Sequence, residues 1–419
     1  MGFVAIIFYK TVHKFRIRSL TFGKIKKAGN FEVITQKNSL QYEKKIFTKV
    51  EAALSICYAN AKGHLLSRLT TFYGVITGLL LRKKVDMESI GHGFLQEIQI
   101  DSRRVNSKRF FANDRITYEF FYQPYIYTIL QQLFSQNKSC EPLILTIDGT
   151  ALGNKHAALA MSFLYEDVAL PLCWLVRIGC KGQFKEQQHI ELVQQAFEIL
   201  SPILPPNYQV ILLGDGEFDG AEFQAICCER FNWDYVLRTD CDSLLFENEQ
   251  DPFRPKDLMV DNGDFHFFEQ VGFGAAQKVT TNFVLWHQKK YYGKAIPLLS
   301  NLDDPMRITQ LYKKRYKIER LFKGIKSSGF NIHQTRLTKI AAIQRLIMVV
   351  SIAYILMICF AKQNTENPMK SKIFRDRQKK VLSPIVMAIR FLNYCMENCI
   401  DFILSFQMSK NLFLKSNYD

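Results

Sequence analysis

Four residues whose side chains suit work on a phosphate group stand at fixed distances along a basic segment. Tyr312, Arg315, Glu319 and Lys326 lie within the run LYKKRYKIERLFKGIKSSGF. On an α-helix, their offsets of 3, 7 and 14 residues place all four side chains within an arc of roughly 60°. The spacing predicts an amphipathic helix with the quartet on its polar face. The apolar residues expected on the opposite, buried face are Ile318, Leu321, Phe322 and Ile325.

A lone carboxylate among so many cations has two interpretations. Glu319 stands four residues from both Arg315 and Lys323, so it can form ordinary ion pairs on a solvated helix. It can equally hold a metal ion beside a polyanion. Taken alone, a single Glu favours the ion pair, and only acids elsewhere in the chain raise the metal interpretation above it.

Two such acids follow apolar runs that are typical of strands. Asp148 closes PLILTID and Asp215 closes YQVILLGD, and open α/β sheets expose their ligand sites at the carboxyl ends of strands. Each Asp by itself is as readily a turn residue as a ligand. Glu217 and Asp219 follow in GDGEFDG, but they are expected in the turn or the next helix start, where acids are favoured anyway.

Asp148, Asp215 and Glu319 together suggest metal-dependent chemistry. Three clustered carboxylates repel one another unless a divalent cation joins them, and hard oxygen ligands select Mg²⁺, with Mn²⁺ as an alternative. Two such ions about 4 Å apart can activate a water or a sugar 3′-OH and stabilise the leaving oxygen of a phosphodiester. We therefore predict that these three acids are catalytic and bind the metal.

The elements that must position these acids can be read from the pattern of apolar runs. From Glu141 the order is three strands, a helix, a strand, a helix and a strand, and the Glu319 helix follows later. This succession predicts an α/β fold with an RNase H-like core and a mixed sheet. The predicted regions are a helical DNA-binding region at 1–135, the first part of the core at 141–240, a β-rich insertion at 241–305, the second part of the core at 306–362 and a basic helical region at 363–419.

Composition favours a polyanionic partner. The 419 residues include 55 Lys and Arg against 39 Asp and Glu, which gives a net charge of +16, and a chain this basic favours nucleic acid. A second basic cluster lies beside Phe110 and Phe111 and indicates either a helix that meets phosphates or a solvated basic face. Its members are Arg103, Arg104, Lys108 and Arg109.

Cysteine usage and hydropathy point to the cytoplasm. The ten cysteines are scattered without a C-x-x-C pair, which favours a reduced chain without structural zinc. The apolar part of MGFVAIIFYKTVHK is too short for a signal peptide. Leu346–Ala361 is 16 residues long and contains Ser351, so we predict a buried helix and no membrane segment.

The quartet and the two Asp motifs resemble a known family. Tyr312, Arg315, Glu319 and Lys326 are similar to the Tyr-(2)-Arg-(3)-Glu-(6)-Lys signature of DDE transposases of insertion-sequence family four. Asp148 in IDGT resembles the first Asp motif of that family, and Asp215 in GDGEFD resembles the second, with 66 residues between them. Another 103 residues lie between Asp215 and Glu319. The resemblance covers about residues 100–350.

The resemblance implies an RNase H-like core with a β-strand insertion and two Mg²⁺ ions. It also implies an N-terminal region that recognises terminal inverted repeats, and a homodimer that pairs the transposon ends. By the same resemblance, Tyr312, Arg315 and Lys326 position DNA phosphates. The chain departs from the family at Gly216, where an Arg often follows the second Asp. Trp286 is interpreted as a core residue on a strand rather than as a holder of a flipped base.

The resulting hypothesis is a DNA transposase of the bacterial cytoplasm or nucleoid. It would cut phosphodiester bonds at the ends of an insertion sequence and join the freed 3′-OH to double-stranded target DNA. Two alternatives remain open from the sequence: an RNase H-like nuclease without strand transfer, and a catalytically silent or domesticated DNA-binding protein.

Overall fold

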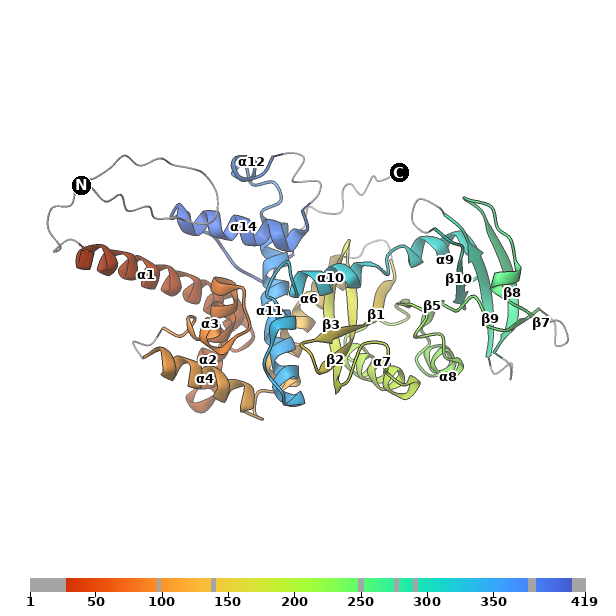
Figure 1. Ribbon diagram of the computed structural model, residues 1–419, viewed down its shortest axis with the longest axis horizontal. Helices are drawn as coiled ribbons and strands as arrows, with labels where there is room; N and C mark the ends of the chain where they lie inside the picture. Colours follow the sequence, from red (N-terminus) through yellow and green to blue (C-terminus); the bar gives the residue numbers. More distant parts are fainter. Residues whose placement is uncertain are drawn as a thin grey trace, which may run out of the picture.

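The computed structural model describes residues 28–95, 99–136, 141–247, 252–274, 279–288, 293–375 and 382–408. The N-terminal stretch MGFVAIIFYKTVHK and the second half of the basic run KSKIFRDRQKK lie outside these ranges. The described part is elongated (Figure 1). The N-terminal helices gather at one end, and the sheet extends from the middle of the molecule to the other end, where the insertion strands lie.

All described strands belong to one mixed sheet with the order β3-β2-β1-β4-β5-β10-β9-β8-β6-β7. Their bounds are β1 Leu143–Leu152, β2 His156–Tyr165, β3 Val168–Ile178, β4 Val210–Gly214, β5 Asp234–Arg238, β6 Leu245–Phe246, β7 Pro252–Phe253, β8 Phe265–Phe273, β9 Val279–Trp286 and β10 Ile296–Ser300.

The first five strands follow the predicted succession. β1, β2 and β3 are antiparallel neighbours, joined by short turns in which Gly153 and Glu166 take positive φ. β4 and β5 then run parallel to β1, because helical crossovers return the chain to the same end of the sheet. The crossover helices are α7 Glu186–Leu200, α8 Ala221–Ala225 and the π-helical turn Ile226–Arg230. The predicted mixed α/β order is confirmed.

The segment 241–305, predicted to be β-rich, contains the strands β6 to β10. β10 pairs antiparallel with β5, so β6–β10 lengthen the same sheet instead of folding into a second one. Trp286 ends β9 opposite Ile296 and is only 4% exposed. This burial places the Trp286 ring in the core, as predicted from the sequence.

Helices cover the sheet and build the N-terminal end of the molecule. α11 packs against β3, α2, α4, α10 and α14, and it passes between the N-terminal helices and the sheet (Figure 1). The bounds are α1 Ala28–Leu54, α2 Gly63–Arg82, α3 Met87–Gly91, α4 Ile100–Ala112, α5 Tyr118–Phe121, α6 Gln123–Gln136, α9 Pro305–Tyr312, α10 Lys317–Ile325, α11 Ile340–Gln363, α12 Lys370–Ile373 and α14 Pro384–Glu397, with 3₁₀ turns at Ser55–Cys57, Pro255–Asp257 and Ile332–Gln334.

Two of the described helices, α2 and α11, are long and apolar enough to cross a membrane by length and composition. In α11, 89% of the apolar window is buried inside the protein, against 56% in α2. The core helix of a soluble protein meets the same criterion, and α11 is the buried helix predicted around Leu346–Ala361. It begins at Ile340 and ends at Gln363.

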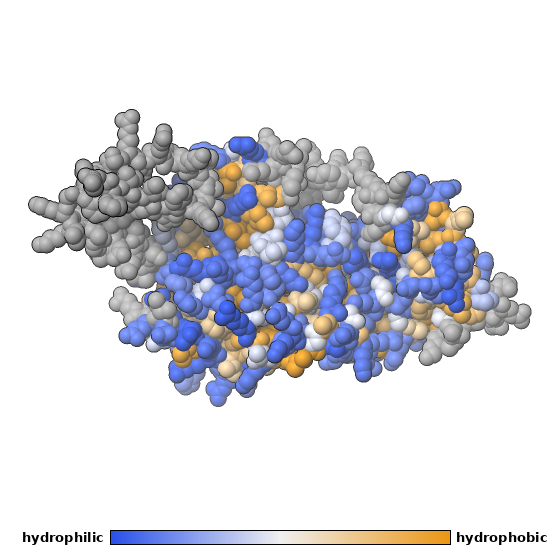
Figure 2. Space-filling model, in the orientation of Figure 1, coloured by the Kyte–Doolittle hydropathy of each residue, from blue (hydrophilic) through white to orange (hydrophobic). Residues whose placement is uncertain are grey.

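The basic helix α4 packs on one side and is exposed on the other. Phe110 and Phe111 are buried, whereas Arg104, Lys108 and Arg109 are exposed. Hydrophilic residues also cover most of the described surface on the face shown in Figure 2. The predicted two-sided helix is therefore present, while its contact with phosphates stays a prediction.

Candidate active site

Asp148 and Asp215 stand side by side in the register of two parallel strands. The last paired residues of β1 and β4 are Thr146 and Leu213, and Asp148 and Asp215 each follow two residues later. Neighbouring strands lie about 4.8 Å apart, so the two aspartates are adjacent across the end of β4.

The expected strand end at Asp148 is wrong in detail. β1 continues to Leu152, because its pairing with β2 extends four residues past Asp148. β4 stops at Gly214, so Asp215 is at a strand end as predicted. Asp148 is thus held inside β1 and is 2% exposed. It lies level with the point where the neighbouring strand β4 ends.

The quartet does not lie on one regular helix, which corrects the sequence prediction. α9 ends at Tyr312 and α10 begins at Lys317, and the residues between them form tighter turns with hydrogen bonds three residues apart. Lys326 follows the last residue of α10. Tyr312, the last residue of α9, is only 2% exposed. Because the tighter turns follow it, Tyr312 does not keep the angular offset to Glu319 that a single α-helix would impose.

The apolar face predicted for this segment is confirmed, since all four of its residues are buried. α10 packs across β1 and β3 and against α11, so it brings its first turn toward the aspartates. Glu319 lies in that first turn, where a carboxylate is favoured by the helix dipole. The buried residues are Ile318, Leu321, Phe322 and Ile325.

Arg315 links Glu319 to Asp215. Its Nη2 donates to Glu319 Oε1 at 2.6 Å, and its Nη1 lies 3.8 Å from Asp215 Oδ2. The guanidinium also lies over the Tyr312 ring, 5.8 Å from the centroid. Tyr312 and Glu319 therefore meet at Arg315, which also faces Asp215, even though the helix that carries them is interrupted.

Lys181 is a site residue that sequence reasoning missed. It lies in the loop between β3 and α7, and its Nζ donates to Asp148 Oδ1 at 2.9 Å. Gly149 N also donates to the same oxygen, at 2.7 Å. The CKGQFK segment carries no motif that would have singled out Lys181; only the closure of the loop over β1 brings it to the acid.

Glu217 is the second residue that was undervalued. Its backbone N donates to Asp215 Oδ1 at 3.2 Å, and its side-chain Oε2 is buried without a hydrogen-bond partner. Asp219, in contrast, accepts from Thr239 Oγ1 at 2.5 Å. Glu217 thus turns back toward the aspartates, while Asp219 is bound to a neighbouring strand end.

The charges of the site act on one another. Burial raises the pKa of Asp148. The negative charge of Asp215 raises this pKa further, while the positive charges of Lys181 and Arg315 oppose the rise. Burial also lowers the pKa of Lys181, but the carboxylates of Asp148, Asp215 and Glu217 outweigh burial and raise it. Lys181 therefore stays charged and stabilises the acids around it.

Lys326 completes the group of cations around Asp148. Burial and the nearby charge of Lys181 lower the pKa of Lys326, and Asp148 opposes the change. Two lysines are thus close enough to one buried carboxylate to act on it electrostatically, and Lys181 contacts it directly. Such paired cations are suited to an additional anion such as a DNA phosphate.

The carboxylate oxygens of the site suit a hard divalent cation, but the described residues do not bring three such side chains together. Carboxylate oxygens are the ligands that Mg²⁺ and Mn²⁺ prefer, and the unpartnered Oε2 of Glu217 lacks a positive neighbour at hydrogen-bond distance. Among the described residues, however, no group of three or more His, Cys, Asp and Glu side chains is placed to hold a metal ion. Instead, Lys181 pairs with Asp148 and Arg315 pairs with Glu319.

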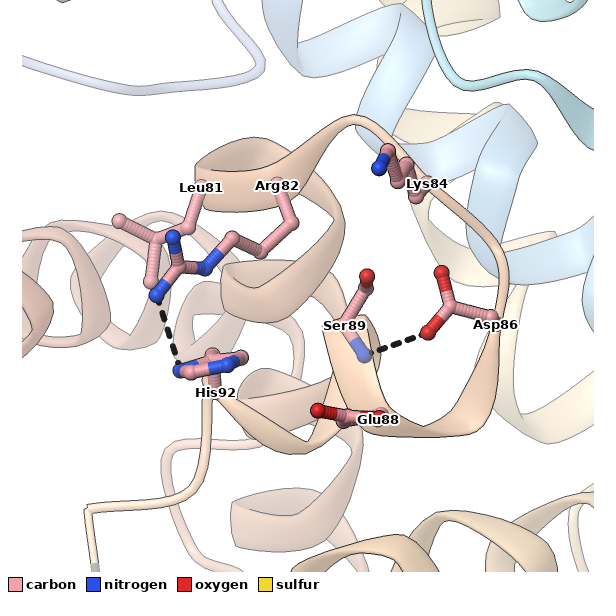
Figure 3. A pocket seen from close by; sticks show the side chains of 7 residues that line it. All are labelled: Leu81, Arg82, Lys84, Asp86, Glu88, Ser89 and His92. Carbon is pink, nitrogen blue, oxygen red and sulfur yellow. Dashed lines mark hydrogen bonds between the residues drawn. The ribbon is translucent and has the colours of Figure 1, made fainter. Parts of the chain in front are cut away.

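A separate cavity lies outside this site. It has a volume of about 550 Å³ and is lined by residues of α2, α3 and the loop between and after them. In Figure 3, Arg82 reaches His92, and Asp86 accepts from the backbone of Ser89. None of the three predicted catalytic acids lines the cavity, so its size does not bear on the carboxylate site.

The fold and site together describe an α/β protein in which two carboxylates, one inside β1 and one just after β4, lie among cations. Residues 186–356 match the family model described as a transposase DDE domain. The matched segment includes Asp215 and all of 312–326, whereas Asp148 precedes it. The match supports a DDE transposase and an enzyme that cuts or joins DNA; it extends over less than half of the chain.

The other comparisons add little. The search of curated proteins gave no match. Two structures of Argonaute from Aquifex aeolicus match at 9% identity, with TM-scores of 0.24 and 0.23; they cover 70% and 78% of this chain and 37% and 40% of those chains. This chain therefore spans about two fifths of those proteins. At such TM-scores the likeness carries no argument.

Proposed function

We propose that this protein is a DNA transposase of insertion-sequence family four that cuts the ends of its element and joins them to target DNA. Asp148, Asp215 and Glu319 are the catalytic residues and the metal ligands. The observation that carries the proposal is the adjacency of Asp148 and Asp215, which lie two residues beyond the pair Thr146 and Leu213 of β1 and β4. Arg315 in turn lies between Asp215 and Glu319. The matched DDE domain supports the same class of reaction.

Mg²⁺, or Mn²⁺ in its place, would be held by these carboxylates and would supply Lewis-acid activation of the attacking oxygen and of the scissile phosphate. Hydrolysis at the element end frees a 3′-OH, and that hydroxyl attacks a target phosphodiester in line without a covalent enzyme intermediate. The chain's own contribution is to orient the phosphates and neutralise their charge. Arg315, Lys326 and the buried Tyr312 are proposed to position the DNA backbone.

The partner is double-stranded DNA, first the terminal inverted repeats and then the target. The exposed cations of α4 support an N-terminal DNA-binding region at 1–135, followed by the core at 141–240 and 306–362, the insertion at 241–305 and a basic region at 363–419. A homodimer that synapses two ends and acts in the cytoplasm or nucleoid completes the proposal. The net charge of +16 supports such a partner because it favours binding to the phosphate backbone.

The test uses a labelled DNA fragment that carries the element end and its flank, with a supercoiled target plasmid. The full-length protein should cleave the end and join it to the plasmid in Mg²⁺ and do neither in EDTA. Asp148→Asn, Asp215→Asn and Glu319→Gln should each lower cleavage by at least 1000-fold while binding to the same fragment in EDTA stays within about 3-fold of wild type.

The exposed Glu222 of α8 provides the matched control, and Glu222→Gln should cleave normally. Cleavage that survives in all three acid variants overturns the assignment. Cleavage without joined plasmid would indicate a nuclease without strand transfer, and binding without cleavage by the wild type would indicate a silent DNA-binding protein.

A further inference from the structure

We infer that a second basic surface, which we call the bridging surface, guides the element-end duplex between α4 and the carboxylates. It consists of the exposed cations Lys155, Arg336 and Lys339, and its partner is the phosphate backbone of double-stranded DNA. The inference rests on the proposed function, because it states how the DNA substrate lies on the protein. These residues belong neither to the basic face of α4 nor to the quartet.

Two segments that are far apart in the sequence form the bridging surface. Lys155 lies in the turn between β1 and β2, whereas Arg336 and Lys339 lie in the loop between the 3₁₀ turn Ile332–Gln334 and α11. The loop also follows the end of α10, the helix that carries Glu319. Both segments are therefore connected directly to elements that position the proposed catalytic acids.

The two segments pack on each other through their backbones. Gly153 has a φ of 60°, and a Cβ added there would lie 3.3 Å from Thr335 O. His156 is 5% exposed, and its Nε2 donates to Thr338 O at 3.1 Å. The fold therefore holds the turn with Lys155 against the loop with the other two cations.

The positive charge of the bridging surface is not neutralised within the described part of the chain. Lys155, Arg336 and Lys339 form no ion pair with a described acid. Residues 149–165 and 320–365 contain no Asp or Glu at all. A solvated basic face commonly mixes acids with its cations, whereas an acid-free patch of unpaired cations attracts a polyanion.

Lys339 stands where its charge does not stabilise the fold. It immediately precedes α11, its side chain makes no capping hydrogen bond, and the first turn of α11 contains no acid. The helix dipole is positive at this end and disfavours a cation there. The stability of α11 therefore does not explain Lys339, whereas a bound phosphate does.

The bridging surface lies between the carboxylate site and the cations of α4. β1 carries Asp148 and continues into the turn that contains Lys155. On the other side, α11 begins directly after Lys339 and is fastened to α4, because Arg345 Nη1 donates to Phe111 O at 2.9 Å. α11 accordingly stands between α4 and the strands β1 to β3 (Figure 1). This continuity assigns the surface to the same duplex that α4 is proposed to bind, the element end.

The experiment measures binding of the full-length protein to a labelled element-end duplex in EDTA, over about 50 to 300 mM salt. The triple variant Lys155→Gln, Arg336→Gln and Lys339→Gln should lower the slope of log K against log salt by about 2–3, because each phosphate contact contributes about 0.9. At about 150 mM salt its affinity should fall by at least 10-fold. Its Tm should not fall, since the three side chains are exposed.

Two matched controls accompany this variant. Lys155→Arg, Arg336→Lys and Lys339→Arg together keep the charge and should bind as the wild type does. The second control removes the same charge from exposed positions elsewhere, and it should change the affinity by less than about 3-fold. Its substitutions are Arg230→Gln, Lys294→Gln and Arg390→Gln. An equal loss in this second control would overturn the inference, because only the net charge would then matter.

Strand transfer from a pre-cleaved end distinguishes the element end from the target. If the triple Gln variant binds the element end normally but needs more plasmid for joining, the surface binds target DNA and the inference is overturned. Unchanged binding and joining would mean that the surface faces solvent, which also overturns it. In both cases cleavage by the wild type leaves the proposed function standing. A wild type that does not cleave in Mg²⁺ refutes the proposed function, while the binding comparison in EDTA still decides the role of the surface.

Discussion

Arg315 donates a hydrogen bond of 2.6 Å from Nη2 to Oε1 of Glu319, four residues later in the chain. Because Arg315 also faces Asp215, it connects Glu319 to the aspartates. The ion pair that a solvated helix would form by itself is thus present, but its Arg is only 14% exposed and also faces Asp215. The simple helical pairing and the catalytic arrangement are not alternatives in this protein, because one guanidinium takes part in both.

Replacing Arg315 should weaken DNA binding and cleavage without unfolding the protein. Arg315→Met removes the charge that faces Asp215 and Glu319, so we expect end-DNA binding to weaken by about 10-fold and cleavage to fall by at least 100-fold. Gel-shift and cleavage assays measure the two effects. Lys323→Met, on an exposed residue of the same helix, should change cleavage by less than about 3-fold; an Arg315→Met protein that cleaves normally would contradict this role.

The close contact between α10 and α11 should be sensitive to a single methyl group. A Cβ at Gly324 would lie 2.7 Å from Cε2 of Tyr354, and Tyr354 is 3% exposed, so the ring has little room to move. Gly324→Ala is therefore expected to lower the free energy of unfolding by about 1–3 kcal/mol and to displace the helix that carries Glu319. Urea unfolding measures the loss.

The control for this substitution is Lys323→Ala, one residue earlier and exposed. It should leave the free energy of unfolding within about 0.5 kcal/mol of wild type. If Gly324→Ala proves as stable as that control, the packing of α10 on Tyr354 is looser than the contact implies.

The buried His189 should make stability depend on pH. Burial lowers the pKa of His189 below its ordinary value of 6.5, while Glu186 and Asp215 oppose the change; the ring packs on Phe218, with centroids 4.7 Å apart. A base with a lowered pKa in the folded state binds its proton more tightly when unfolded. The free energy of unfolding should therefore fall as pH drops below about 6.5, by up to about 1.4 kcal/mol per pH unit.

Urea midpoints at pH 7.5 and 5.5 test this dependence. His189→Gln should lose less stability between the two pH values than wild type, because the titrating group is gone. His64→Gln, at an exposed position, should behave as wild type does. Equal pH dependence in wild type and His189→Gln would argue against a buried neutral imidazole.

The exposed cations of α4 should set the salt dependence of DNA binding. Substituting Arg104, Lys108 and Arg109 together by Gln is expected to reduce the slope of log K against log salt by about 2–3, since each phosphate contact contributes about 0.9. Titrations from 50 to 300 mM salt would measure the slope. The double variant Arg104→Lys and Arg109→Lys keeps the positive charge and should keep the slope. An unchanged slope in the triple Gln variant would mean that these residues of α4 face solvent and do not contact DNA phosphates.

The sequence by itself determined the succession of elements and which runs are buried. The alternation of apolar runs with turns was sufficient for β1–β5 and for the two longest strands of the insertion, β8 and β9, because burial of an apolar face is a local property of the pattern. Trp286 and the apolar side of α10 were predicted for the same reason. The matched DDE domain supports the class of enzyme that the spacing of Tyr312 to Lys326 suggested.

Only the tertiary structure decided how the charged side chains meet. The register of β1 with β4 places Asp148 beside Asp215. The break in the helix after Tyr312 orients Arg315 toward Asp215, and the loop after β3 brings Lys181 to Asp148. None of these contacts is periodic in the sequence, since each joins residues distant along the chain through the packing of other elements. For that reason Lys181 was missed and Glu217 was undervalued, while the residues with fixed local spacing were found.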